Sequence, residues 1–106
     1  MYDTVVDPIV LHQHRDDADW CIVDCRASLT DAAAGLDAYR AGHIPGAVFA
    51  DLASDLSSQV VPGVTGRHPL PDAAVLASTF GRWGIGAGTQ VVAYDAGNAA
   101  YAARLW

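Results

Sequence analysis

The sequence contains no lysine and no glutamate: its 12 acidic residues are all aspartate and its 6 basic residues are all arginine. The net charge is −6, and the arginines are scattered along the chain. A surface for nucleic acid needs clustered cations, so this class of partner is excluded, although a local arginine can still bind a small anion.

Long hydrophobic runs are also missing. No apolar stretch approaches the ~20 residues that a transmembrane helix requires, so we expect no membrane partner. The first residues lack the basic and apolar regions of a secretory signal peptide. These absences predict a cytoplasmic protein.

Cysteine is scarce, with only Cys21 and Cys25. Both lie in the segment 20–26, which has the apolar character of a strand. Four residues of strand span ~13 Å, whereas a disulfide needs Cα atoms within ~7 Å. Two cysteines without histidines are too few for a zinc site. We therefore expect two reduced, buried thiols and no metal site.

What is present fits one ordered α/β domain over residues 1–106, with 52% hydrophobic residues and a mean hydropathy of +0.19. We expect strands at 5–6 (short, at an edge), 20–25, 47–49 and 89–94. We expect helices at 8–14, with the apolar face Ile9, Val10 and Leu11; at 36–41; at 72–83, with the face Val75, Leu76, Phe80 and Trp83; and from about 98 onward. This alternation predicts a central, mostly parallel sheet flanked by helices, with right-handed crossovers.

The last predicted helix is still running at Trp106, and no strand follows it. An α/β unit normally returns to its sheet with another strand. We therefore expect that the domain is truncated at its C-terminal end and belongs to a longer protein. The open sheet edge would favour self-association.

Chemistry in α/β folds gathers at the carboxyl ends of strands, so the loop after the strand 89–94 is the first candidate site. The loop begins at Asp95 and leads to a helix N-terminus, where backbone N–H groups converge. A carboxylate there could be a nucleophile, as in phosphatases that form an aspartyl-phosphate. Those sites usually carry a second aspartate two residues on, where this chain has Gly97. The structural alternative is that Asp95 caps the helix or the turn.

Asp24 and Arg26 end the first long strand. They could contact an anionic substrate or form a structural ion pair. His43 stands beside the Pro45-Gly46 turn, where a hydrogen-bonded loop histidine is the alternative to a functional base.

Several segments together resemble the rhodanese homology domain, over residues from about 4 to 106. They are Val23-Asp24-Cys25-Arg26; the run from Tyr39 to Phe49, with Gly42-His43-Ile44-Pro45-Gly46-Ala47 at its centre; Gly66-Arg67-His68-Pro69-Leu70-Pro71; and Val92-Ala93-Tyr94-Asp95-Ala96-Gly97-Asn98. The last two look like the N-terminal domain of tandem sulfurtransferases, which transfer sulfur from thiosulfate or 3-mercaptopyruvate to an acceptor.

The resemblance implies a three-layer rhodanese-like fold and no cofactor. It makes Asp95, Ala96, Gly97, Asn98, Ala99 and Ala100 the equivalent of the catalytic loop. Active rhodanese domains begin that loop with a cysteine that carries sulfur as a persulfide. Asp95 cannot do so, and its charge would repel thiosulfate.

This chain therefore matches the silent, N-terminal half of a tandem enzyme whose catalytic cysteine lies in a missing C-terminal domain. Such a parent acts on a small sulfur-containing substrate. Ala27 departs from the larger aromatic residue common in that half, so a substrate contact there is open. The alternative is a stand-alone, catalytically silent rhodanese-like binding or regulatory module.

Overall fold

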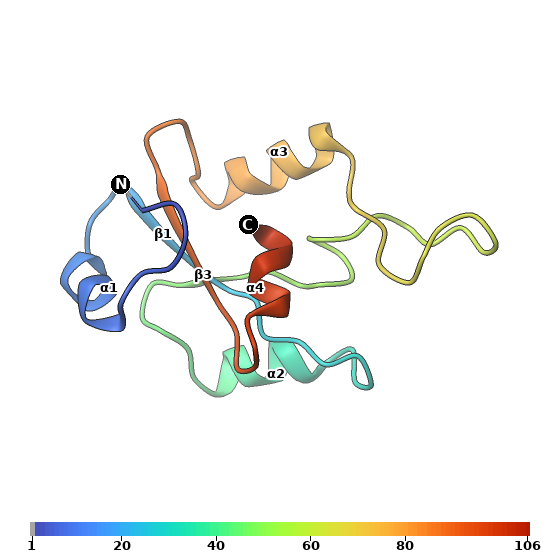
Figure 1. The fold of residues 1–106 in the computed structure, drawn as a ribbon, viewed down its shortest axis with the longest axis horizontal. Helices are drawn as coiled ribbons and strands as arrows, with labels where there is room; N and C mark the ends of the chain where they lie inside the picture. Colours follow the sequence, from blue (N-terminus) through green and yellow to red (C-terminus); the bar gives the residue numbers. More distant parts are fainter. Residues whose placement is uncertain (1) are drawn as a thin grey trace.

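Three parallel strands form the centre of the computed structural model, which describes residues 2–106 (Figure 1). The elements follow one another as α1 (Pro8–His14), β1 (Trp20–Asp24), α2 (Ala34–Ala41), β2 (Val48–Phe49), α3 (Ala73–Arg82), β3 (Gln90–Tyr94) and α4 (Ala100–Leu105). The predicted parallel α/β fold is confirmed, and each long helix and strand lies within a few residues of its expected place.

The strand order is β2-β1-β3, so β1 is the central strand. Asp24, the last residue of β1, is in register with Phe49 on one side and Tyr94 on the other. Because the strands are parallel, their carboxyl ends meet at one edge of the sheet. The segments that follow β1 and β3, which contain the candidate residues, therefore lie side by side.

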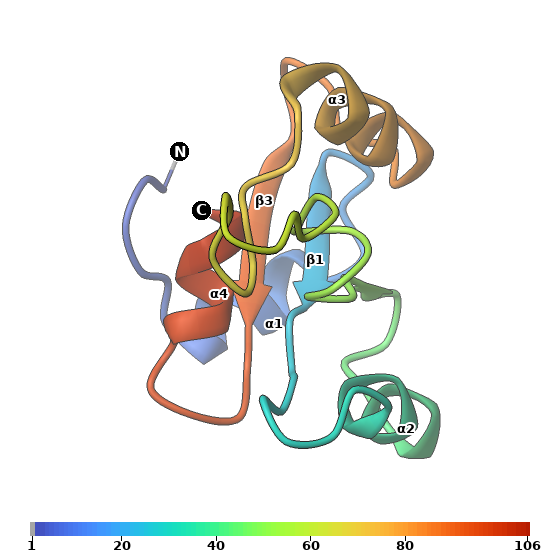
Figure 2. The same ribbon diagram turned by 90° about the vertical axis from the view of Figure 1, so that its right-hand side faces the viewer.

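Helices lie on both sides of the strands: α1 on one side, α3 and α4 on the other, and α2 near the carboxyl ends (Figures 1 and 2). Alternation along β1 sends Val23 and Cys25 into a core with Ala50 and Leu56. Ile22 is also buried, at 4% exposure. Of the two thiols expected to be buried, Cys25 is buried, whereas Cys21 is only partly buried.

The predicted edge strand at residues 5–6 is wrong. Instead, the side-chain amide of Gln90 accepts a hydrogen bond from the backbone N–H of Tyr2 (2.9 Å) and donates one to its carbonyl (3.1 Å). A side chain therefore holds the N-terminal segment in place of a backbone ladder, and Val5 remains 87% exposed.

Each of two helices departs from its expected face at one residue, while the other predicted residues of both faces are partly buried. In α1, the carboxylate of Asp7 caps the helix by accepting the N–H of Ile9, and Ile9 itself is exposed. In α3, Val75 is exposed and Thr79 is the most buried residue. Thr79 can replace an apolar residue because its hydroxyl donates to the Val75 carbonyl one turn earlier (3.2 Å).

Glycine is required at two places near the carboxyl ends of the strands. Gly46 has φ +82°, as the predicted Pro45-Gly46 turn demands. Gly35, in α2, lies so close to the segment that follows β1 that a Cβ atom would stand 2.2 Å from the carbonyl oxygen of Arg26. Gly35 thus sets the distance between α2 and the segment that follows β1.

Within residues 2–106, no helix is both long enough and apolar enough to cross a membrane.

Candidate functional site

The loop after β3 is organised by the side chain of its first residue, Asp95. One carboxylate oxygen accepts the backbone N–H groups of Gly97 (2.9 Å) and Ala99 (3.2 Å). The other accepts those of Tyr101 (3.1 Å) and Ala102 (3.0 Å). The N–H groups that converge on this loop are therefore taken up by a side chain of the loop itself.

These four hydrogen bonds also set the charge state of Asp95. Burial on its own would raise the pKa of the carboxyl group, but the bonds from the backbone outweigh burial and hold the pKa below its ordinary value. Asp95 is therefore an anion at neutral pH, and its capping role agrees with the structural alternative.

The rest of the loop is short and partly strained. Asn98 caps Ala100 through its side-chain oxygen (3.2 Å), and Ala99 adopts a left-handed conformation with φ 69°. A left-handed alanine costs about 1–2 kcal/mol. The bonds to Asp95 hold Ala99 in this conformation, so that α4 can begin at Ala100.

The end of β1 is organised by a buried ion pair. The Asp24 side chain has no exposed surface, and Arg26 donates to both of its oxygens, with the shortest contact at 2.7 Å. The same guanidinium donates to the carbonyl of Gly42 (2.7 Å). Asp24 and Arg26 thus satisfy each other, which favours the structural role over contact with a substrate.

Tyr94 connects this pair to β3. Its hydroxyl donates to Asp24 (3.0 Å) and accepts the backbone N–H of Ile44 (3.2 Å). Burial on its own would raise the pKa of Asp24, but the hydrogen bonds from Arg26 and Tyr94 outweigh it and the pKa lies below its ordinary value. The network joins β1, β3 and the turn that carries His43.

His43 itself points away from this network. Its ring stacks on Tyr39, with centroids 3.7 Å apart, and its Nδ1 lies 2.7 Å from the Tyr39 carbonyl. The structure thus brings Asp24 and Arg26 together and places the His43 side chain on the helix that precedes the turn. The hydrogen bond expected of a loop histidine is present.

Neither cysteine is placed to act as a nucleophile. Cys25 is 1% exposed, and burial, followed by the negative charges of Asp24 and Asp95, raises the pKa of its thiol to about 12. Burial also raises the pKa of Cys21. Within residues 2–106, no group of three or more His, Cys, Asp or Glu side chains is arranged to hold a metal ion.

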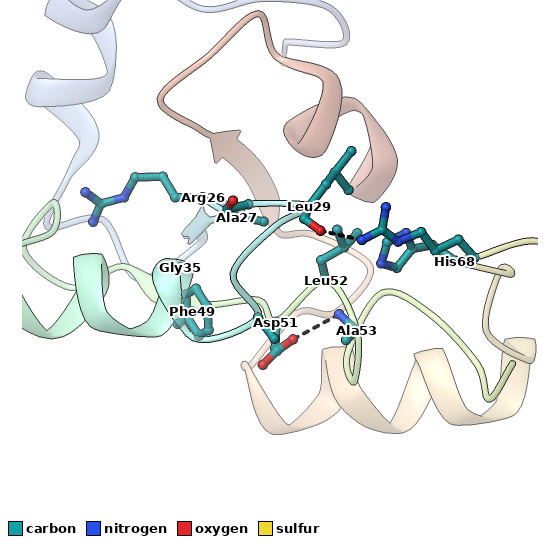
Figure 3. A pocket seen from close by; sticks show the side chains of 12 residues that line it. Arg26, Ala27, Leu29, Gly35, Phe49, Asp51, Leu52, Ala53 and His68 are labelled. Atoms are coloured by element: carbon teal, nitrogen blue, oxygen red, sulfur yellow. Dashed lines mark hydrogen bonds between the residues drawn. The ribbon is translucent and has the colours of Figure 1, made fainter.

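A small cavity of about 100 Å³ lies beside the site, between the segments 26–29, 51–53 and 67–68 (Figure 3). Arg67 and His68, from the long loop between β2 and α3, supply part of its polar wall, and Arg67 donates to the carbonyl of Leu29. Figure 3 shows the guanidinium of Arg26 directed away from the cavity. Ala27 contributes only a methyl group to its lining.

Two residues that organise the site were not predicted from the sequence. Tyr94 could have been noticed as a hydroxyl that directly follows the aliphatic residues Val91, Val92 and Ala93. Arg104 is the only charged residue of α4, and it donates to the carbonyls of Leu56 (3.1 Å) and His68 (2.5 Å). Arg104 thereby fixes the long loop, and with it the cavity, to α4.

Comparison with known proteins agrees with this architecture. Residues 7–106 match the sequence profile of the rhodanese-like domain. The chain belongs to the rhodanese-like domain family. This rhodanese-like domain is 53% identical, over 88 residues, to a Pseudomonas aeruginosa protein named as a 3-mercaptopyruvate sulfurtransferase. The match covers 83% of the domain and 31% of the relative.

Two further relatives extend the comparison. A Mycobacterium tuberculosis protein named as a thiosulfate sulfurtransferase is 47% identical over 85 residues, which cover 80% of this domain and 29% of that protein. The structure of 3-mercaptopyruvate sulfurtransferase from Leishmania major superposes with a TM-score of 0.84 and 35% identity, over 95% of this domain and 27% of that chain. The domain therefore spans about a third of the length of the curated relatives that it matches.

Proposed function

We propose that this chain is the N-terminal, non-catalytic rhodanese domain of a sulfurtransferase whose catalytic cysteine lies in a C-terminal domain outside this chain. The parent enzyme moves the outer sulfur of thiosulfate, or the thiol sulfur of 3-mercaptopyruvate, to a thiol or to cyanide. The names of the relatives support the reaction class. The observation that carries the non-catalytic role is the position of Asp95, whose two oxygens take up the four converging N–H groups of the loop.

Sulfur transfer of this kind needs a thiolate. The thiolate attacks the outer sulfur of thiosulfate, the bond between the two sulfur atoms breaks, and sulfite leaves with the bonding electrons. An acceptor then removes the sulfur from the persulfide and restores the thiolate. A carboxylate cannot form this persulfide, and the raised pKa values of Cys21 and Cys25 keep both thiols protonated at neutral pH.

The test is to locate the transferred sulfur in the parent protein. After treatment with thiosulfate or 3-mercaptopyruvate, peptide mass mapping should find the added sulfur atom on a cysteine outside residues 1–106. Cys21 and Cys25 should carry none, and the 106-residue chain alone should show no thiosulfate:cyanide activity. An added sulfur on Cys25 would contradict the non-catalytic role.

A matched variant addresses the aspartyl-nucleophile alternative. Asp95→Asn removes the charge and any nucleophilic role of the carboxylate. Under this proposal, the parent enzyme keeps most of its turnover when assayed well below its melting temperature. A loss of turnover with the fold intact would instead make Asp95 a catalytic residue.

The second candidate function is a catalytically silent binding or regulatory module. The loop N–H groups are hydrogen-bonded to Asp95, and the pKa of the Cys25 thiol is raised. Both observations fit a silent module as well as they fit the non-catalytic domain of a sulfurtransferase. Mass mapping separates them, because a silent module acquires no sulfur at any cysteine of the parent protein.

A further inference from the structure

The cavity beside the site has the size and the position of a small ligand site. Its volume is about 100 Å³, and it lies between the segments that follow β1 and β2 and the residues 67–68 of the long loop. A water molecule takes up about 30 Å³ in the liquid, so the cavity has room for about three waters or for one small organic molecule. Ligands of α/β folds bind beyond the carboxyl ends of the strands, which is where this cavity lies.

Arg67 is the cation of the cavity that has no acidic partner. Within residues 2–106, its side chain makes one hydrogen bond, to the carbonyl of Leu29, and no salt bridge. The second arginine of the lining, Arg26, is already paired with Asp24, and Figure 3 shows its guanidinium directed away from the cavity. A guanidinium carries five N–H donors, so Arg67 keeps several donors for an anion.

His68 adds a polar side chain to the same wall, and the backbone around it is held in place. The His68 carbonyl accepts a hydrogen bond from Arg104 of α4 (2.5 Å), and the Pro69 carbonyl accepts the N–H of Ser58 (2.9 Å). The ring of His68 makes no hydrogen bond to the described part of the chain, residues 2–106, so its N–H is available to a ligand. Because these bonds already order the loop, less freedom is lost when a ligand binds.

The other residues of the lining limit which anion fits. Asp51 also lines the cavity, and its carboxylate accepts the N–H of Ala53 (2.9 Å; Figure 3). The negative charge of Asp51 disfavours a ligand with two negative charges, because only Arg67 offers a compensating cation. Apolar side chains complete the lining, among them Leu29, Phe49 and Leu52. These surroundings favour a single carboxylate on a short apolar chain over a dianion such as sulfate.

We propose that this cavity binds a small organic carboxylate, with the guanidinium of Arg67 on the carboxylate, the ring N–H of His68 as a further donor, and the apolar side chains around the carbon chain. The planar guanidinium matches the two oxygens of a carboxylate. Arg67 is exposed, so water competes for its donors and the dissociation constant should be millimolar. The proposal rests on the cavity alone and does not depend on sulfur transfer.

Nuclear magnetic resonance of the parent protein tests the proposal, with propionate as the probe. At constant ionic strength, propionate should shift the amide resonances of Leu29 and Ala53 along a saturable, single-site binding curve. Propionamide has the same shape without the charge, and sulfate has a second charge. Both should bind at these amides at least about 10-fold more weakly, because each loses a charge-assisted hydrogen bond or meets Asp51.

Two variants locate the bound carboxylate. Arg67→Gln removes the charge, whereas Ala27→Leu fills the cavity and leaves Arg67 and its bond to Leu29 in place. Each should weaken propionate binding at least about 10-fold. Arg40→Gln is the matched control, because Arg40 is an exposed residue in the last turn of α2 and does not line the cavity. It removes the same charge and should leave the binding curve unchanged.

Four results would overturn the proposal. The first is the absence of saturable shifts at Leu29 and Ala53 in the parent protein. The second is equal binding of propionate and either propionamide or sulfate, and the third is an equal loss of binding in Arg40→Gln and Arg67→Gln. The fourth is unchanged binding in Ala27→Leu, which would place the carboxylate on the exposed guanidinium outside the cavity. Ala27→Leu also keeps the test decisive if Arg67→Gln does not fold.

Discussion

Asp24 ends β1 and Asp95 follows the neighbouring parallel strand β3, at the same edge of the sheet, and each is stabilised as an anion in a different way. Asp24 is paired with the guanidinium of Arg26 and accepts a hydrogen bond from the hydroxyl of Tyr94. Among residues 2–106, Asp95 has no cationic partner, and its carboxylate accepts four backbone N–H groups. In both cases burial opposes ionisation and hydrogen bonding outweighs it, so neither carboxylate is left free to react.

The difference between the two lies in the distance that their partners span along the chain. Every partner of Asp95 lies within seven residues of it. The network of Asp24 reaches Tyr94, 70 residues away, and through Arg26 it reaches Gly42. Asp24 therefore holds separate segments of the domain together, whereas Asp95 shapes one loop and one short helix. Substitution at the two positions should separate global from local stability.

The largest effect is expected for Asp24→Ala. Removing one partner of a buried ion pair costs about 3–5 kcal/mol. Arg26 keeps part of its surface in water, so we expect about 3 kcal/mol, measured as the loss in the free energy of unfolding by urea.

The control for Asp24 is Asp72→Ala. Asp72 is the N-cap residue of α3, but its side chain makes no capping hydrogen bond. We expect a loss of only a few tenths of a kcal/mol. Equal losses for the two variants would show that the Asp24 network does not hold the fold together.

A second substitution tests how tightly the end of β1 is packed. Gly35→Ala places a Cβ atom 2.2 Å from the Arg26 carbonyl, and α2 must move to accommodate it. Overpacking of this kind costs about 2 kcal/mol.

Gly81→Ala is the matched control for Gly35, because Gly81 also lies in a helix but has no atom within 4 Å of the position of a Cβ. It should gain up to about 1 kcal/mol from helix propensity. Thermal melts of both variants should therefore shift in opposite directions. A stabilising Gly35→Ala would mean that α2 is not held against β1.

The same contrast explains what the sequence could predict. The start of α1 at Pro8, the end of α2 at Ala41, the Pro45-Gly46 turn and the cap at Asp95 all depend on residues close in sequence, and all are confirmed. Burial of Val75 was predicted wrongly, although Leu76, Phe80 and Trp83 of the same face are partly buried, because helical spacing alone does not show how wide the covered face of α3 is. The bond from Tyr94 to Asp24 follows from strand register, which only the folded chain fixes.

At Asp95 we expect a smaller and more local effect. Asp95→Asn replaces one acceptor oxygen with an NH₂ group that faces N–H donors, so about two of the four bonds are lost. Loss of a helix cap costs about 1–2 kcal/mol. The amides of Tyr101 and Ala102 should exchange faster, while those of β1 stay unchanged.

Asn98→Ala is the control within the same loop. It removes a single capping bond, to Ala100, and should cost less than Asp95→Asn. Faster exchange throughout β1 in Asp95→Asn would show that this loop, contrary to the comparison, supports the whole domain.

The smallest effect is expected in the pH dependence of stability. Asp24 and Asp95 both have pKa values below the ordinary value in the folded chain, so the unfolded chain binds protons first as the pH falls. Their contribution is fully present above the pKa of an unfolded aspartate, about 3.9, and is lost as the pH drops through the lower folded values. Urea unfolding measured from pH 6 downward should therefore show that the free energy of unfolding decreases once the pH is below about 5. The decrease per pH unit should be smaller in Asp95→Asn and in Asp24→Ala. Gly35→Ala removes no titratable group and should keep the slope of the parent sequence. If both aspartate variants retained that slope, the acid sensitivity of the domain would have to come from its other carboxylates.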